Sequence, residues 1–280
     1  MINFGTSGVS DSMKADNLNY SQIAKKLKSL GLDSFEYPFT YGTNISDEKC
    51  KEIGEAFLSE GVNLSVHAPY YINLASGDEE AVLKSFGHIY NSMKKAKVMG
   101  ADRVVFHPGS LTKQTREVAF NNVLSNLKRF VESIAGDELV EGVLLCPETM
   151  GKHGQIGTPD EVLEMCKLSN ILIPTIDFGH INAFSGGGLI SKEGFASIIE
   201  KFVIGLEKKE IHIHFSKIEY GGKGEIKHLT FETDPGFGPD ERLMIQALSD
   251  FDANFRIISE SAGTQDKDSK IMLDYYKKGF

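Results

Sequence analysis

Short apolar runs rich in β-branched residues alternate with longer amphipathic segments along the whole chain. The runs begin near residues 2, 34, 63, 103, 142, 171, 210 and 255, and their lengths are typical of buried strands. The segments between them, such as 20–31, 79–100 and 115–136, repeat apolar residues at helical spacing and close on a glycine. Eight strands that alternate with helices in 280 residues predict a closed (β/α)8 barrel, a TIM barrel, rather than an open doubly wound sheet.

The same pattern bears on domain organisation. No linker or low-complexity tract interrupts the alternation, so residues 1–280 are predicted to form one domain. The segment after the first strand, "GTSGVS", does not match the GxGxxG phosphate loop of dinucleotide-binding folds. The least regular part, Gly221 to Pro239, is rich in glycine, and we predict a long loop there.

Composition narrows the functional classes. The chain is 41% hydrophobic and 25% charged, with no apolar run long enough to span a membrane and no secretory signal pattern, so we expect a cytoplasmic protein without a membrane partner. Cys50, Cys146 and Cys166 are odd in number and far apart, which argues against disulfides and thiolate zinc sites and favours reduced, partly buried thiols. The net charge of −9 argues mildly against a nucleic-acid partner.

Titratable side chains recur where the predicted strands end. In a (β/α)8 barrel the functional groups lie at the carboxyl ends of the strands, so these side chains are expected to meet at one rim. Buried carboxylates and imidazoles gathered without cations would leave unpaired charge, and metal ions resolve that cost. The predicted rim residues are His67, His107, Glu148, Asp177, His180, His214 and Glu260.

The donor types indicate which metals to expect. Mixed imidazole and carboxylate ligation without cysteine favours Zn²⁺, with Mn²⁺ or Fe²⁺ as competitors. One ion takes about four to six donors, and the rim offers more than that, so we expect two or three ions. A cluster of ions is typical of enzymes that carry out in-line displacement at phosphorus.

Six short motifs resemble those of the endonuclease IV family, zinc-dependent apurinic/apyrimidinic endonucleases of the xylose isomerase-like barrel superfamily. They are, in order along nearly the whole chain, "VHAPYYINLAS", "FHPGS", "PETM", "DFGH", "HFS" and "ISES". The resemblance implies that Glu148 is the catalytic bridging ligand of two zinc ions. It implies that His67 and His107 complete the first site and that Asp177, His214 and Glu260 complete the second.

The resemblance also implies a third zinc ion, held by His180 and by residues of the loop after the seventh strand. His228 matches the histidine of that loop. The family's aspartate is absent, because Ile226 occupies its position. We expect either Glu225 or a water molecule to take its place.

The adjacent tyrosines Tyr70 and Tyr71 match the family residues that enter DNA at the lesion, where the abasic nucleotide is flipped out. Aromatic rings can fill the vacated stack at modest cost, although packing within the loop is the simpler alternative. The resemblance thus implies a hydrolase that cuts the phosphodiester 5′ to abasic sites in damaged double-stranded DNA. Bound divalent ions would offset the acidic net charge at the surface that meets phosphate, and we expect a monomer.

Two alternatives remain open. Sugar isomerases and epimerases of the same superfamily hold one ion such as Mn²⁺ with a Glu, Asp, His, Glu set, which Glu148, Asp177, His214 and Glu260 would also satisfy. They do not need the two histidines of the third and fourth strands, which favours the nuclease. A barrel that binds metal without catalysis is the other alternative. Strand alternation places His212 on the same face as His214, and we assign His212 to the barrel core.

Overall fold

Eight parallel strands form the centre of the molecule in a computed structural model that describes residues 1–40, 42–232 and 236–280. Each of the eight predicted apolar runs contains one of these strands, because buried β-branched and aromatic residues favour extended backbone. The strands are β1 (Ile2–Ser7), β2 (Ser34–Pro38), β3 (Asn63–His67), β4 (Arg103–Phe106), β6 (Leu144–Pro147), β8 (Thr175–Asp177), β9 (Glu210–Phe215) and β12 (Asn254–Ser259).

The strands follow one another around a ring. Their order is β6-β4-β3-β2-β1-β12-β9-β8, and every neighbouring pair in it is parallel. Two further parallel bridges, Leu145 with Leu172 and Glu148 with Thr175, join the two ends of this order. The ring is thereby nearly closed, and the predicted (β/α)8 barrel is confirmed.

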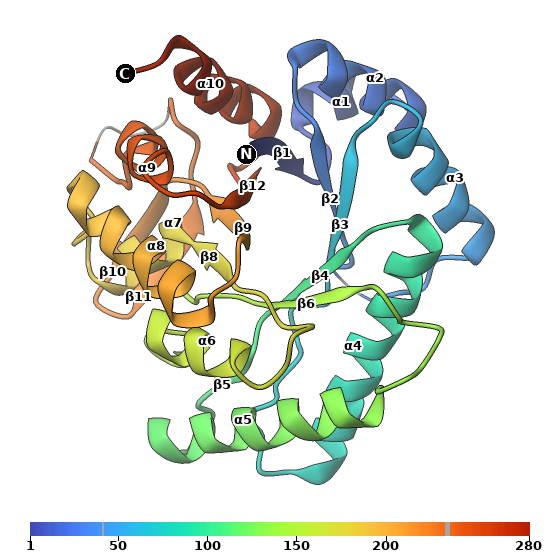
Figure 1. Cartoon of the computed structure of the whole chain (residues 1–280), viewed down its shortest axis with the longest axis vertical. Helices are drawn as coiled ribbons and strands as arrows, with labels where there is room; N and C mark the ends of the chain where they lie inside the picture. Colours follow the sequence, from blue (N-terminus) through green and yellow to red (C-terminus); the bar gives the residue numbers. More distant parts are fainter. Residues whose placement is uncertain (41, 233–235) are drawn as a thin grey trace.

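Helices surround the ring, as Figure 1 shows. The prediction that helices end at a glycine is confirmed for α2 and α4. Gly31 and Gly100 follow these helices with left-handed φ angles of 82° and 72°, which glycine adopts readily. The helices are α1 (Asp11–Ala15), α2 (Tyr20–Leu30), α3 (Asp47–Leu58), α4 (Glu79–Met99), α5 (Arg116–Ser133), α6 (Pro159–Cys166), α7 (Phe178–Phe184), α8 (Lys192–Leu206), α9 (Glu241–Leu248) and α10 (Gln265–Lys278).

The prediction of a loop across residues 221–239 was wrong for its first part. Strands β10 (Ile218–Gly221) and β11 (Gly224–His228) form an antiparallel hairpin there. Gly224 has a φ of +89°, and a Cβ at this position would lie 2.1 Å from the carbonyl oxygen of Gly151. The abundant glycine therefore marks a tight turn docked on another loop. Residues 233–235 of the predicted loop lie outside the described residues. A second short pair, β5 (Gly109–Ser110) with β7 (Gln155–Ile156), lies at the same rim.

Most of the buried side chains are apolar, and the three cysteines are free, as predicted, and more fully buried than expected. Burial raises the pKa of Cys146 to about 12, so this thiol stays protonated at neutral pH. Among the described residues, no helix has the length and apolar character needed to cross a membrane.

Candidate metal centre

Strand geometry brings the predicted rim residues together. His67 is the last residue of β3, Asp177 is the last residue of β8, and His214 lies one residue before the end of β9. Glu148 directly follows β6, and its backbone N–H donates to the Phe106 carbonyl 3.1 Å away. Because the barrel strands are parallel, these carboxyl ends meet at one rim.

The first cluster gathers His67 and His107 at one oxygen of Glu148. The Nε2 atoms of both histidines lie 3.2 Å from Glu148 Oε2. The side chain of Glu148 is fully buried, whereas those of the two histidines are 15% and 22% exposed. This cluster therefore faces the solvent side of the rim.

The second cluster forms at the other oxygen of Glu148. His214 Nδ1 lies 3.0 Å from Glu148 Oε1 and 3.4 Å from Glu260 Oε2. Asp177 completes the cluster; its Oδ1 accepts a hydrogen bond from the His180 backbone N–H at the start of α7. The other oxygen, Asp177 Oδ2, is buried and has no hydrogen-bond partner among the described residues, although His180 Nδ1 lies 3.2 Å away.

The third cluster joins α7 to the β10–β11 hairpin. Glu225 Oε2 lies 3.5 Å from His180 Nε2, and Glu225 Oε1 lies 3.8 Å from His228 Nε2. The side chain of Ile226 is 56% exposed and is not part of the cluster. Of the two substitutes considered for the missing aspartate, the structure brings the carboxylate of Glu225 to this place.

The spacing and chemistry of these atoms fit metal ions. Around a zinc ion with bonds of about 2.1 Å, ligand atoms at tetrahedral angles lie about 3.4 Å apart. The ligand atoms within each cluster lie within 4.8 Å of one another, and the orphaned Asp177 Oδ2 is a donor atom that an ion would satisfy. In the described part of the chain, the ion-pair partners of Glu148, Asp177 and Glu260 are all histidines. No lysine or arginine among the described residues pairs with these three carboxylates, whereas in the third cluster Lys152 Nζ lies 4.0 Å from Glu225 Oε1.

The pKa values in the metal-free site also indicate that its carboxylates need a positive charge nearby. Burial alone would lower the pKa of His67, but the hydrogen bond and charge of Glu148 outweigh it and raise this pKa to about 9. Burial also opposes a charge on His180, yet Asp177 and Glu148 raise its pKa to about 10. Burial raises the pKa of Asp177 to about 6, and the charges of Glu148 and Glu260 add to the effect. Without metal, protons on His67 and His180 offset part of the negative charge at neutral pH, whereas burial lowers the pKa of His107.

Several known proteins are similar to this chain in sequence. A family model described as "Xylose isomerase-like TIM barrel" matches residues 24–278. The chain belongs to this barrel family. An uncharacterized protein of Methanocaldococcus jannaschii is 38% identical over 93% of this chain and 92% of its own. A "Probable endonuclease 4" of Aquifex aeolicus is 29% identical over 71% of this chain and 73% of its own.

Solved structures of the xylose isomerase-like barrel family agree on the fold. A "D-tagatose 3-epimerase-like protein" has a TM-score of 0.69 and 24% identity, covering 98% of this chain and 97% of its own. Endonuclease IV from Thermus thermophilus has a TM-score of 0.65 and 19% identity over 99% of both chains. The predicted superfamily is confirmed by the family model, and the proteins that share the fold carry names of both the nuclease and the epimerase kind.

The entrance to the site in this barrel is a pocket of about 280 Å³. It is lined by members of all three clusters, Glu260 among them, and by Tyr70, which is 56% exposed. Tyr71, 43% exposed, packs edge-on against His88 of α4 with ring centroids 4.7 Å apart. The structure thus brings Tyr70 to the pocket and places Tyr71 beside it, against a helix.

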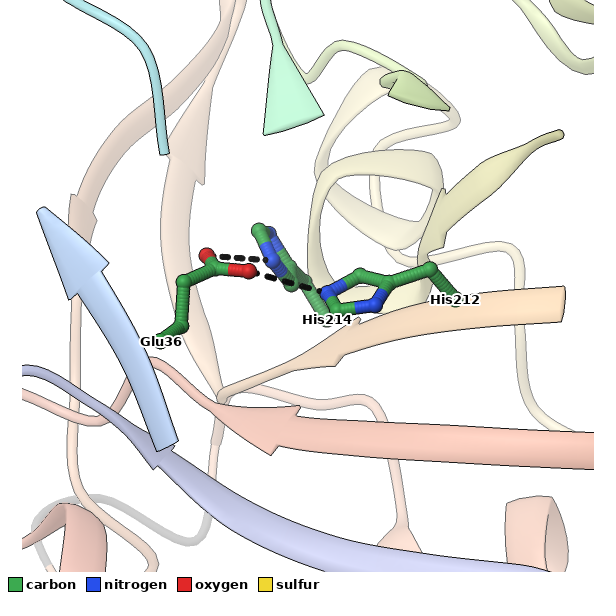
Figure 2. A group of neighbouring side chains, drawn as sticks. All are labelled: Glu36, His212 and His214. Atoms are coloured by element: carbon green, nitrogen blue, oxygen red, sulfur yellow. Dashed lines mark ion pairs between the residues drawn. The ribbon is translucent and has the colours of Figure 1, made fainter. Parts of the chain in front are cut away.

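Sequence reasoning missed one acidic residue of the interior, Glu36 on β2. Glu36 is fully buried and lies 3.0 Å from His212 and 2.9 Å from His214, as Figure 2 shows. His212 is buried in the barrel, as assigned, but it contacts this carboxylate rather than apolar side chains alone. The signal was the single acid in the strand "SFEYPF", where Ser34 and Glu36 share one face.

Proposed function

We propose that this chain is a metal-dependent endonuclease that hydrolyses the phosphodiester 5′ to abasic sites in double-stranded DNA. The observation that carries the proposal is the approach of His67 and His107 to Glu148, at 3.2 Å each. An isomerase that works with one ion needs only the second cluster and has no use for these two imidazoles. Relatives named as probable endonuclease 4 support the same choice.

Each cluster supplies ligands of a suitable kind. His67, His107, Glu148, Asp177, His180, His214, His228 and Glu260 are the proposed ligands, with Glu225 in place of the family aspartate. When bound, two or three zinc ions, or Mn²⁺ in their place, supply Lewis-acid chemistry and positive charge at the phosphate. The two oxygens of Glu148 face different clusters, so this residue fixes their separation, and we assign it the catalytic role.

The tyrosines are the proposed contacts to the lesion. Tyr70 lines the pocket and the ring centroid of Tyr71 lies 5.5 Å from that of Tyr70, so both rings lie beside the entrance. A ring that enters the duplex stacks on the bases that flank the missing one. The abasic nucleotide then reaches the clusters through the same entrance.

Cleavage of a defined duplex tests the proposal. The protein is incubated with a duplex that contains one abasic analogue, with and without chelator, and the ends of the products are mapped. We expect cutting on the 5′ side that leaves a 3′-hydroxyl and stops with chelator. His67→Ala should abolish cutting, whereas His153→Ala should not, because His153 is exposed and belongs to none of the three clusters. Intact duplex after incubation with metal-loaded protein would contradict the proposal.

One observation favours a second candidate, a ketose epimerase or isomerase that uses a single ion. Glu148, Asp177, His214 and Glu260 form a complete four-donor set, and the pocket of about 280 Å³ is of the size of a small ligand site. Metal content separates the candidates. About three zinc ions per chain favour the nuclease, and one manganese ion with turnover of a ketose favours the epimerase.

A further inference from the structure

A buried carboxylate lies behind the second cluster, on the side away from the pocket. Glu36 Oε1 lies 2.9 Å from His214 Nε2, and Glu36 Oε2 lies 3.0 Å from His212 Nε2. Figure 2 shows that each carboxylate oxygen faces one imidazole. All three side chains are fully buried. The arrangement is a carboxylate that pairs with two imidazoles inside the barrel.

Glu36 and His214 come from strands that do not neighbour each other in the sheet. Strands β2 and β9 are not adjacent in the sheet, because β1 and β12 lie between them. The carboxylate therefore reaches across the barrel interior to His214. Ser65 on β3 donates a hydrogen bond of 2.8 Å to Glu36 Oε2, which fixes the carboxylate from a third strand.

His214 presents its two ring nitrogens to different partners. Nδ1 faces Glu148 and Glu260 in the second cluster, and Nε2 faces Glu36. An imidazole that ligates a metal through one nitrogen carries its proton on the other, and a carboxylate beside that proton fixes the tautomer and the ring orientation.

We propose that Glu36 is a positioning residue that holds the proton of His214 on Nε2, so that the Nδ1 lone pair points into the second cluster. The proposal rests on the proposed function, because it assumes that the second cluster holds a metal ion. His212 and Ser65 both contact the second carboxylate oxygen, which limits rotation of Glu36 away from His214.

The contact geometry leaves one competing arrangement. The nitrogens of both histidines approach Glu36 closely, but neither contact has the alignment of a standard hydrogen bond. The proposed role requires each ring to turn so that its N–H bond points at the carboxylate oxygen. A metal ion shared by Glu36, His212 and His214 would instead make Glu36 a ligand, and the experiment distinguishes the two.

Glu36→Gln is the informative change because it keeps the size of the side chain. The amide oxygen can accept from one imidazole, but its NH₂ group then faces the N–H of the other, so one ring must change its tautomer or turn away. Glu241→Gln is the matched control, a substitution at another buried glutamate that lies beside Arg242 on α9. Ser65→Ala, which removes only the hydroxyl that holds Glu36, is a milder second variant if Glu36→Gln does not fold.

Two measurements read the result. Zinc titration of the metal-free proteins should show one site weakened about 10- to 100-fold in Glu36→Gln and unchanged in Glu241→Gln. Histidine ¹⁵N NMR of the metal-free proteins, recorded at a pH high enough that His214 carries a single proton, should show that proton on Nε2 in the wild type and displaced in Glu36→Gln. The NMR result tests the action of Glu36 on His214 separately from zinc binding, whose absence in the wild type would defeat the proposed function. Unchanged tautomers and zinc affinities in Glu36→Gln would overturn the proposal. So would an additional zinc ion, bound by the wild type outside the three clusters and lost in Glu36→Gln, because Glu36 would then be a ligand.

Discussion

The two ends of the barrel bury charge in opposite ways. At the amino end of the strands, Asp102 pairs with both guanidinium nitrogens of Arg256 at 2.7 and 2.9 Å, and with Arg103 at 3.0 Å. At the carboxyl end, Glu148 lies within 3.3 Å of imidazole nitrogens alone, those of His67, His107, His180 and His214.

The difference lies in what the partners can do. A guanidinium is always charged and satisfies a carboxylate permanently, whereas an imidazole is a cation only when protonated and a metal ligand only when neutral. At the amino end, two permanently charged guanidiniums neutralise Asp102. The carboxyl end holds acids whose neutralisation depends on protons or on metal, and this is why we place function there and stability at the other end.

Removing the residue shared by two clusters should give the largest effect. Glu148→Ala takes one donor atom from each of the first two clusters, so metal content should fall and cleavage of abasic duplex should drop more than about 10³-fold. Elemental analysis measures the metal content, and initial rates measure the cleavage. Full metal content with full activity in this variant would remove the bridging role.

Truncating the rim tyrosines should act on substrate and spare the metals. With Tyr70→Ala and Tyr71→Ala combined, binding to abasic duplex should weaken by about 1 to 3 kcal/mol per lost stacking contact. Fluorescence anisotropy with labelled duplex measures the change, and elemental analysis should show unchanged metal. Equal affinity in the variant and the wild type would assign these rings to loop packing.

Breaking the charge pairing at the amino end should act on stability alone. Asp102→Asn leaves Arg256 without its carboxylate and leaves Arg103 with Glu210, 3.8 Å away, but the Asp102 side chain is 45% exposed and water screens the loss. We expect unfolding to become easier by about 1 to 2 kcal/mol, with metal content unchanged. Urea denaturation measures the change in the free energy of unfolding, and elemental analysis measures the metal content. A loss of metal would show that the two ends are coupled.

The pH dependence of stability should show the most gradual effect. Burial lowers the pKa of His67, but Glu148 raises it to about 9, above the ordinary value of 6.5, so the protonated ring stabilises the metal-free fold. This stability is fully present below pH 6.5 and is lost as pH rises through 9, by up to about 1.4 kcal/mol per pH unit. Denaturation at several pH values should show this slope for metal-free protein and a weaker slope with zinc. Identical slopes would contradict metal binding at His67.

Local patterning made much of this molecule predictable. Alternating apolar runs and amphipathic segments indicated every barrel strand, because burial on both faces demands apolar, β-branched residues. The pattern predicted where strands begin and end less well than it predicted that they exist. Strand β8 begins at Thr175, four residues after the apolar run at 171 starts, since Pro174 has no N–H to donate to a neighbouring strand.

The hairpin after β9 shows where local reasoning failed. Glycines in residues 221–224 indicated an irregular loop, yet Gly224 is needed for close approach to Gly151. That contact lies between segments far apart in the chain, so no local pattern reveals it. The hairpin in turn decides that Glu225, rather than Ile226, meets His180.

By itself the sequence determined the barrel and the rim, because strand ends follow from local patterning and parallel strands must bring their carboxyl ends together. Only the tertiary structure decided which oxygen of Glu148 meets which imidazole, and that Glu36 reaches across the barrel to His212 and His214. The physical reason is that side-chain contacts across a barrel depend on strand register and tilt. These are set by packing of the whole ring and leave no periodic trace in any one strand.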